Sequence, residues 1–272
     1  ALGGAPTNFA YHCQQLGHEA ISVSAIGRDT LGEEIKAELQ ARQLPAILQE
    51  TDYPTGTVQV TLSPTGSPTC EISEDVAWDH IAFTDELRAL AQRTDAVCFG
   101  SLAQRHEASR TTILSFLKAM PEGSLRIFDI NLRLQYYTRE TIHTSLEHAD
   151  ILKLNDEEVP IVARLLGLEG DMEAVCHQVL TDYSLRAVIL TRGADGCSIY
   201  HEKGSVFHPS ACIEVADTVG AGDSFTAGFV SALLAGRSHL EAVALATRIA
   251  AFVCCHHGAM PTLPSEYRVV EA

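Results

Sequence analysis

The chain has 272 residues, of which 46% are hydrophobic and 20% are charged, and its formal net charge is −16 at pH 7. A chain of this length and composition can bury the core of one large globular domain. The negative charge argues against a nucleic-acid partner, because affinity for DNA or RNA depends on Lys and Arg neutralising phosphates. No apolar run approaches the roughly 18 residues that a membrane-spanning helix needs, so we expect no membrane partner.

The eight cysteines are scattered along the chain, and no Cys-x-x-Cys pair occurs among them. Several lie in apolar surroundings such as Ala96–Phe99, where Cys behaves as a small buried hydrophobic residue. This usage indicates reduced core cysteines, and we therefore expect a cytoplasmic protein.

The first part of the chain is predicted to contain two helices and a strand. The pattern indicates a Gly-rich turn and a helix between Gly3 and about Leu16, a strand at Ala20–Ile26, and a helix at Asp29–Leu44. The helices are indicated by apolar residues that recur every three or four positions.

The stretch from about residue 46 to residue 81 has a different pattern. Thr57–Leu62 alternates apolar and polar residues, Pro64–Gly66 is a turn, and Thr69–Ser73 is extended again. Such alternation predicts a hairpin with one solvent-facing side. We expect a small β-sheet that acts as a lid on the main body, and an ordinary edge hairpin is an equally good interpretation.

Strands and helices alternate from residue 96 onward. The predicted strands are Ala96–Phe99, Arg126–Asp129, Ile151–Leu154 and Ala187–Thr191, and the predicted helices are Glu107–Ala119, Thr138–Ala149, Glu157–Leu166 and Met172–Tyr183. This order predicts a three-layer, doubly wound α/β fold with a mostly parallel sheet. No repeat or linker interrupts it, so we expect one domain over residues 1–272. Ligands of such sheets bind outside the carboxyl ends of the strands.

The most specific motif is Asp217–Phe225, which follows the strand-like segment Cys212–Val215 and opens an apolar helix. Its small residues Gly220, Ala221 and Gly222 let backbone N–H groups point into one concavity at a helix N-terminus, where an anion is favoured. The next residue is an Asp, which suits an incoming hydroxyl while the amides hold developing phosphoryl charge. A plain helix cap after a glycine turn is the alternative.

This string resembles the signature of the ribokinase-like, or PfkB, carbohydrate kinases, and the resemblance covers nearly the whole chain in the family's order. It implies a ribokinase-like fold and ATP-dependent phosphorylation of a primary sugar hydroxyl. It also implies that Asp223 is the catalytic base and that the amides of Gly220, Ala221 and Gly222 form the anion hole.

A second part of the resemblance lies near the N-terminus. Gly3–Asn8 resembles the family's Gly-Gly-x-x-x-Asn element, which implies that Gly3, Gly4 and Asn8 contact sugar hydroxyls. Family members usually begin with a strand that ends in a sugar-binding Asp, and this chain starts after that strand. We therefore expect that about 20–30 residues, the share of one strand–helix unit, are missing before Ala1 and contain this strand.

The nucleotide half of the resemblance includes Asp129–Arg133, which matches Asp-x-Asn-x-Arg, and Asn155–Glu158, which matches Asn-x-x-Glu. The second motif implies that Asn155 and Glu158 organise the waters around Mg²⁺, a hard cation that keeps much of its hydration. By itself the same pattern indicates a helix cap with an early Glu.

The third nucleotide motif is Thr191–Gly196, which resembles Thr-x-Gly-x-x-Gly and by itself indicates no more than a tight turn. A monovalent cation, K⁺, is implied near Asp217 and the Gly258 loop. The residues that the resemblance assigns to ATP are Asn155, Thr191, Gly193, Gly196, Gly220 and Gly222.

The subtype is indicated by Gly3–Leu16, Gly100–Arg105, Glu71–Asp79 and Val215–Asp217, which resemble the fructokinase-type branch. The resemblance favours conversion of D-fructose to fructose 6-phosphate. Arg105 is either a residue that reaches the sugar across the lid or a solvated surface arginine.

Two alternatives to a fructokinase stay open. One is a kinase of ribose, 2-keto-3-deoxygluconate or a nucleoside, and the other is a non-catalytic sugar- or nucleotide-sensing protein of the same fold. The solvent-facing hairpin also suggests a homodimer that forms through the two lids.

Overall fold

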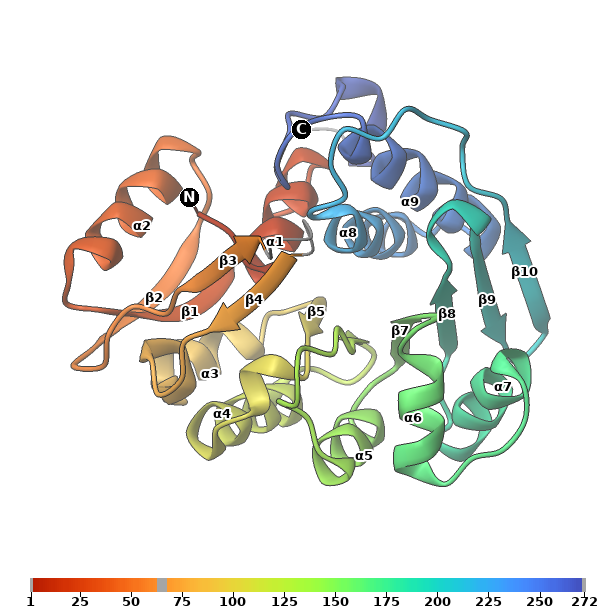
Figure 1. Cartoon of the computed structure of the whole chain (residues 1–272), viewed down its shortest axis with the longest axis horizontal. Helices are drawn as coiled ribbons and strands as arrows, with labels where there is room; N and C mark the ends of the chain where they lie inside the picture. Colours follow the sequence, from red (N-terminus) through yellow and green to blue (C-terminus); the bar gives the residue numbers. More distant parts are fainter. Residues whose placement is uncertain (1, 63–67, 271–272) are drawn as a thin grey trace.

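The computed structural model describes residues 2–62 and 68–270 of the chain. Its centre is a six-stranded sheet with the strand order β10-β9-β8-β7-β6-β5 (Figure 1). The strands are β5 (Ala96–Phe99), β6 (Leu125–Asp129), β7 (Ile151–Asn155), β8 (Ala187–Thr191), β9 (Cys197–His201) and β10 (Gly204–His208). The first four are parallel and the last two are antiparallel, so the sheet is mostly parallel, as predicted.

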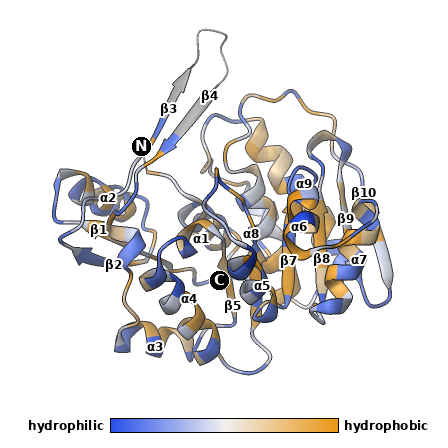
Figure 2. Cartoon of the chain, turned by 60° about the horizontal axis from the view of Figure 1, so that its bottom comes forward, coloured by the Kyte–Doolittle hydropathy of each residue, from blue (hydrophilic) through white to orange (hydrophobic). Residues whose placement is uncertain are grey.

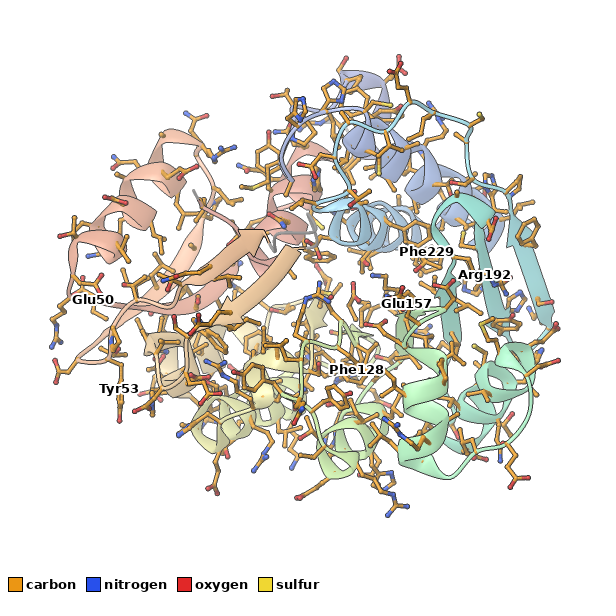
Figure 3. All side chains as sticks on the ribbon, viewed as in Figure 1. Glu50, Tyr53, Phe128, Glu157, Arg192 and Phe229 are labelled. Carbon is orange, nitrogen blue, oxygen red and sulfur yellow. The ribbon has the colours of Figure 1, made fainter. Side chains whose placement is uncertain are left out.

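Helices cover both faces of this sheet. One face carries α3 (Asp85–Ala91), α4 (Glu107–Ala119), α5 (Arg139–Glu147), α6 (Val159–Leu166) and α7 (Met172–Asp182), and the other carries α1 (Ala5–Gln15), α8 (Ala221–Leu234) and α9 (His239–Cys254). Figure 3 labels a buried Phe on each side: Phe128 of β6 packs with the first layer and Phe229 of α8 with the second. The three-layer architecture is confirmed.

Successive residues of each strand alternate between these two cores. In β7, Ile151 packs with the α8–α9 layer and Leu152 with the layer of α3 to α7. Lys153, in the middle of the strand, therefore has the same parity as Ile151 and lies on the α8 side. This parity brings the charged side chain of Lys153 to the N-terminus of α8.

The N-terminal part forms a separate small lobe (Figure 1, red to orange). Strands β1 (Ser22–Gly27) and β2 (Ala46–Thr51) pair in parallel, and α2 (Thr30–Ala41) connects them. Strands β3 (Val58–Leu62) and β4 (Pro68–Ile72) form the predicted antiparallel hairpin, which extends away from the body in Figure 2. The hairpin is therefore shorter than the 46–81 segment that carries the lid prediction.

Two features differ from the prediction. Cys212–Val215, predicted as strand-like, lies in a loop that spans residues 209–220, because no neighbouring strand offers it a hydrogen-bonded partner among the described residues. The antiparallel strands β9 and β10 and the helix α9 are not among the predicted elements. Within the described part of the chain, no helix is both long and apolar enough to cross a membrane.

Candidate active site

The N-terminus of α8 lies beside the carboxyl ends of β6 and β7. Gly220 precedes the helix with a φ of 79°, a left-handed conformation that favours glycine. A Cβ added at this position would lie 2.6 Å from the Cβ of Ala259, so the close packing of the 258–259 loop also requires glycine. The turn is thus defined both by its backbone conformation and by its neighbour.

The amides of this turn are not equivalent. The N–H of Ala221 donates to the carbonyl oxygen of Thr218 at 3.2 Å. The N–H groups of Gly220 and Gly222 have no acceptor among the residues that the structure describes. Gly220 and Gly222 are therefore free to bind an anion, whereas Ala221 would first have to give up its turn bond.

Asp223 lies in the same turn and contacts the predicted sugar-binding element near the N-terminus. The Nδ2 of Asn8, from α1, donates to Asp223 Oδ2 at 2.8 Å, although the two residues are 215 positions apart. Burial raises the pKa of Asp223, while the hydrogen bond from Asn8 acts in the opposite direction. A carboxylate with a raised pKa is a stronger general base than an exposed one.

Behind this turn lies a buried ion pair that the sequence interpretation did not assign. The Nζ of Lys153 lies 3.0 Å from each carboxylate oxygen of Asp129. The signal in the sequence was Lys153 itself, since an unpaired charge would be costly in an otherwise apolar strand. Asp129 is therefore a structural partner of Lys153 in addition to the first residue of the Asp-x-Asn-x-Arg motif.

Asn155 and Glu158, the predicted magnesium residues, form a reciprocal cap. Asn155 Oδ1 accepts the N–H of Glu158 at 2.9 Å, and Glu158 Oε2 accepts the N–H of Asn155 at 2.8 Å. Glu158 Oε1 accepts the N–H of Leu132 at 2.8 Å, which ties the loop after β6 to β7. Burial raises the pKa of Glu158 despite these two bonds. Each oxygen keeps a lone pair that can accept from a metal-bound water.

The predicted nucleotide loop connects β8 to β9. Thr191 ends β8 opposite Asn155 of β7, and Figure 3 shows Glu157 and Arg192 at the same edge of the sheet. Gly193 has a φ of 52°. Gly196 has a φ of 92°, and a Cβ there would lie 2.3 Å from the carbonyl oxygen of His208. The turn therefore requires glycine at 196 for space and at both positions for backbone conformation.

An open cavity of about 450 Å³ lies between the loop before α8 and the end of α9, lined by Ile213–Ala216 and Cys255. Beside it, Asp217 Oδ2 accepts the N–H of Gly258 at 3.0 Å, so the loop before α8 and the loop after α9 meet as the cation prediction requires. Hydrogen bonds from the amides of Val219 and Gly258 lower the pKa of Asp217 and keep it anionic.

The remaining predicted sugar residues have different environments. Gly4 caps α1 with a φ of 104°, whereas a Cβ at Gly3 would meet open space. Arg105 is not a solvated surface arginine, because only 7% of its side chain is exposed and it forms a bidentate ion pair with Asp79 at 2.8 and 2.7 Å. Its guanidinium also lies 4.1 Å from the ring centroid of Trp78, at the base of the hairpin.

A further group of possible metal ligands is formed by Asp75, His80 and His106, whose ligand atoms lie within 4.8 Å of one another. The Nε2 of His80 bonds to Asp75, so it carries the proton. The Nδ1 of His106 accepts the N–H of Ala108, so the proton of a neutral ring is on Nε2. These contacts thus join the three residues to their neighbours by hydrogen bonds, and we interpret the group as a hydrogen-bonded cluster.

A doubly wound α/β fold with free amides and a carboxylate at one helix N-terminus suits an enzyme that binds and transfers a phosphoryl group. The profile described as pfkB family carbohydrate kinase matches residues 1–266. The chain belongs to this family and is a sugar kinase.

Relatives and solved structures agree with this assignment. The chain is 29% identical over 270 residues to the ATP-dependent 6-phosphofructokinase of Thermoanaerobacterium thermosaccharolyticum, covering 97% of this chain and 82% of that protein. It is 27% identical over 287 residues to fructokinase-1 of Zea mays, covering 100% and 88%.

The fructokinase structure from Vibrio cholerae O395, with fructose, ADP and calcium ion bound, has a TM-score of 0.80 and 25% identity, covering 96% and 88%. The fructokinase of Xylella fastidiosa with bound ATP has a TM-score of 0.85 at 19% identity, covering 96% and 87%, which shows the fold alone. The predicted ribokinase-like fold is confirmed.

Proposed function

We propose that this protein transfers the γ-phosphoryl group of ATP to the primary hydroxyl of D-fructose and so produces fructose 6-phosphate and ADP. The observation that carries the proposal is the 2.8 Å bond between Asn8 and Asp223. It joins the predicted sugar-binding element to the predicted base, at a helix N-terminus with free amides.

In this reaction Asp223 orients the sugar hydroxyl and accepts its proton as the oxygen–phosphorus bond forms and the bond to ADP breaks. A carboxylate is too weak a base to ionise an alcohol beforehand, so the proton moves late. The amides of Gly220 and Gly222 bind the charge that develops on the transferred group. Most of the acceleration then comes from positioning and electrostatics.

The residues around α8 suit a magnesium nucleotide. The cavity of about 450 Å³ beside Cys255 is within the usual size range of small-molecule sites and would hold the adenine base. The turn of Thr191, Gly193 and Gly196 would approach the phosphates. Asn155 and Glu158 would hold Mg²⁺ through water, and the ion when bound neutralises phosphate charge.

Fructose 6-phosphate is the second candidate substrate, because one relative is named a 6-phosphofructokinase. A sugar that already carries a phosphate needs an available cation in its site. Two buried cations of this region are each neutralised by a carboxylate, Arg105 by Asp79 and Lys153 by Asp129. Arg133, whose charge also acts on Asp223, is exposed and has no carboxylate partner among the described residues, so the charge pairing alone does not separate the two substrates. Arg105 retains one free nitrogen, Nη1, which is buried without a partner among the described residues and would serve a sugar hydroxyl.

The deciding experiment is ADP release coupled to NADH oxidation with Mg·ATP. The substrates are fructose, fructose 6-phosphate, ribose, glucose, 2-keto-3-deoxygluconate and a nucleoside. We expect turnover on fructose, abolished by Asp223→Asn. Turnover only on another substrate of the panel would retain the mechanism and reject fructose. No turnover on any of them would favour the sugar- or nucleotide-sensing alternative.

A monovalent cation beside Asp217 and Gly258 is part of the same proposal. The N–H of Gly258 donates to Asp217 Oδ2 at 3.0 Å, and this bond and that of Val219 lower the pKa of an aspartate that is anionic at neutral pH in any case. Replacing K⁺ by tetramethylammonium should then reduce turnover. Equal turnover in both salts would reject the cation site.

The hairpin of β3 and β4 is proposed as a lid and as the contact of a homodimer. It extends from the body, and the side chain of Val58 in β3 is 58% exposed. Light scattering should give a dimer that Val58→Lys dissociates, because a buried lysine would lack a partner. A monomeric mass for the unmodified protein would reject the dimer.

A further inference from the structure

Asp129 and Lys153 are direct neighbours across the sheet. They are register partners in the parallel pair β6–β7, where Asp129 is the last residue of β6 and Lys153 is the middle residue of β7. Only 9% of the Asp129 side chain and 11% of the Lys153 side chain are exposed. Removing one member of such a buried pair is strongly destabilising, because the charge of the other is left without a partner.

The pair is also bound to the first turn of α8. The Oγ1 of Thr226 donates to Asp129 Oδ2 at 2.9 Å and lies equally close to the carbonyl oxygen of Gly222. On the other side, the Nζ of Lys153 lies 3.0 Å from the position that a Cβ of Gly222 would occupy. A side chain at 222 would therefore press against the ammonium group.

The charged and titratable groups around Asp223 come from several elements. They are Asp129 of β6, Lys153 of β7, Arg133 of the loop after β6 and the Cys98 thiol of β5. Burial and Asp129 both raise the pKa of Asp223, while Lys153 and Arg133 lower it. Burial by itself would lower the pKa of Lys153, but Asp129 together with Asp223 and Glu158 more than compensates, so the ammonium stays charged.

We propose that Asp129 and Lys153 are a positioning pair for phosphoryl transfer: together they hold the first turn of α8 in place, and their opposite charges cancel at Asp223. The proposal rests on the proposed function of Asp223 as base. It predicts that removing the charge of Asp129 lowers the pKa of Asp223, and that removing the charge of Lys153 raises it.

The experiment uses three variants: Asp129→Asn, Lys153→Gln and the double variant. The readout is the acid limb of the pH profile of kcat/KM for the preferred sugar, which reports the free enzyme's base. Asp129→Asn leaves the lysine charge uncompensated and should shift the acid limb to lower pH by at least about 0.5 pH unit. Lys153→Gln leaves the carboxylate charge and should raise it by a similar amount. The double variant should return to within about 0.3 pH unit of the unmodified enzyme.

A matched control is present on the same two strands. Arg126 and Asp150 form an ion pair at 3.6 Å near the amino ends of β6 and β7, away from α8. Arg126→Gln and Asp150→Asn make the same charge changes, and they should leave the acid limb unchanged. Circular dichroism and thermal unfolding establish which variants are folded. If a single variant does not fold, the double variant carries the test.

Hydrogen exchange of a peptide that spans residues 218–226 provides a readout independent of activity. Exchange of the Ser224 amide, which donates to the carbonyl oxygen of Gly220 at 2.9 Å, should be at least about tenfold faster in the double variant, because the first turn of α8 has lost its support. An unmoved acid limb in the folded single variants, or a displaced one in the double variant, would overturn the charge role. Unchanged exchange in the double variant would overturn the positioning role. Absence of kinase activity in the unmodified protein, with faster exchange in the double variant, would reject the proposed function and retain the positioning pair.

Discussion

The Nε2 of His12 lies 2.9 Å from the carbonyl oxygen of Ala259, the residue against which Gly220 packs. Because a carbonyl oxygen accepts, Nε2 must donate, and the ring is the neutral Nε2–H tautomer. His12 is one helical turn after Asn8 in α1. The same helix therefore contacts both the base and the loop that closes the anion-binding turn.

His12 makes the stability of the fold pH-dependent. Burial lowers its pKa from 6.5 to about 4, so the unfolded chain binds a proton between these values that the folded chain does not. The stabilisation is complete above pH 6.5 and is lost as the pH falls towards 4, by up to about 3 kcal/mol. Urea unfolding should therefore show that the stability gap between the unmodified protein and His12→Gln narrows by this amount from pH 7 to pH 4. A constant gap for His12→Gln would contradict the prediction.

Replacing Asp223 by Asn keeps the shape of the side chain and removes the base. We expect turnover to fall by at least about 100-fold with little change in KM for ATP. Steady-state kinetics with the preferred sugar measures both. Asp182→Asn, at the exposed end of α7, removes the same charge at a distant site and should be neutral. Near-normal turnover of Asp223→Asn would exclude the base role.

Gly220→Ala separates steric contact from backbone strain. Alanine in the positive-φ conformation of residue 220 costs about 1–2 kcal/mol of stability. The new Cβ would also collide with Ala259. Gly236, at the other end of α8, has a similar φ of 76° but open space around it. Both alanine variants should lose similar stability from strain. Only Gly220→Ala should lose more than about tenfold in turnover, because the collision moves the turn that holds the transferred group. Equal kinetics for the two variants would show that this loop does not position the anion site.

Arg105→Lys tests the anchor at the base of the hairpin. Lysine keeps the charge but cannot reproduce the bidentate pair with Asp79 or the stacking on Trp78 and Tyr136. We expect a loss of about 2 kcal/mol in the free energy of unfolding and a higher KM for the sugar. Arg110→Lys, a nearby partly exposed residue of α4, should change neither quantity. An unaltered KM together with lower stability would assign Arg105 to the fold alone.

The local properties of this chain could be read from its sequence. The parallel strands that alternate with helices, the glycine-rich turn before α8 and the order of the motifs all depend on neighbouring residues. Backbone conformation and apolar periodicity express that dependence directly. Gly220, Gly222 and Asp223 could therefore be singled out together. Cys212–Val215 could not be judged in this way, because a strand exists only where another strand lies beside it.

The contacts that complete the site were decided by the tertiary structure. Asn8 reaches Asp223 across 215 positions, and Asp129 meets Lys153 because β6 and β7 pair in one particular register. Arg105, which the sequence left either at the sugar or in solvent, is buried against Asp79 and Trp78. The sequence alone determined which residues can do the chemistry, through their types and local spacing. Only the packing of α1 and the sheet against α8 decided which charges are buried together, because burial and pairing depend on residues far apart in the chain.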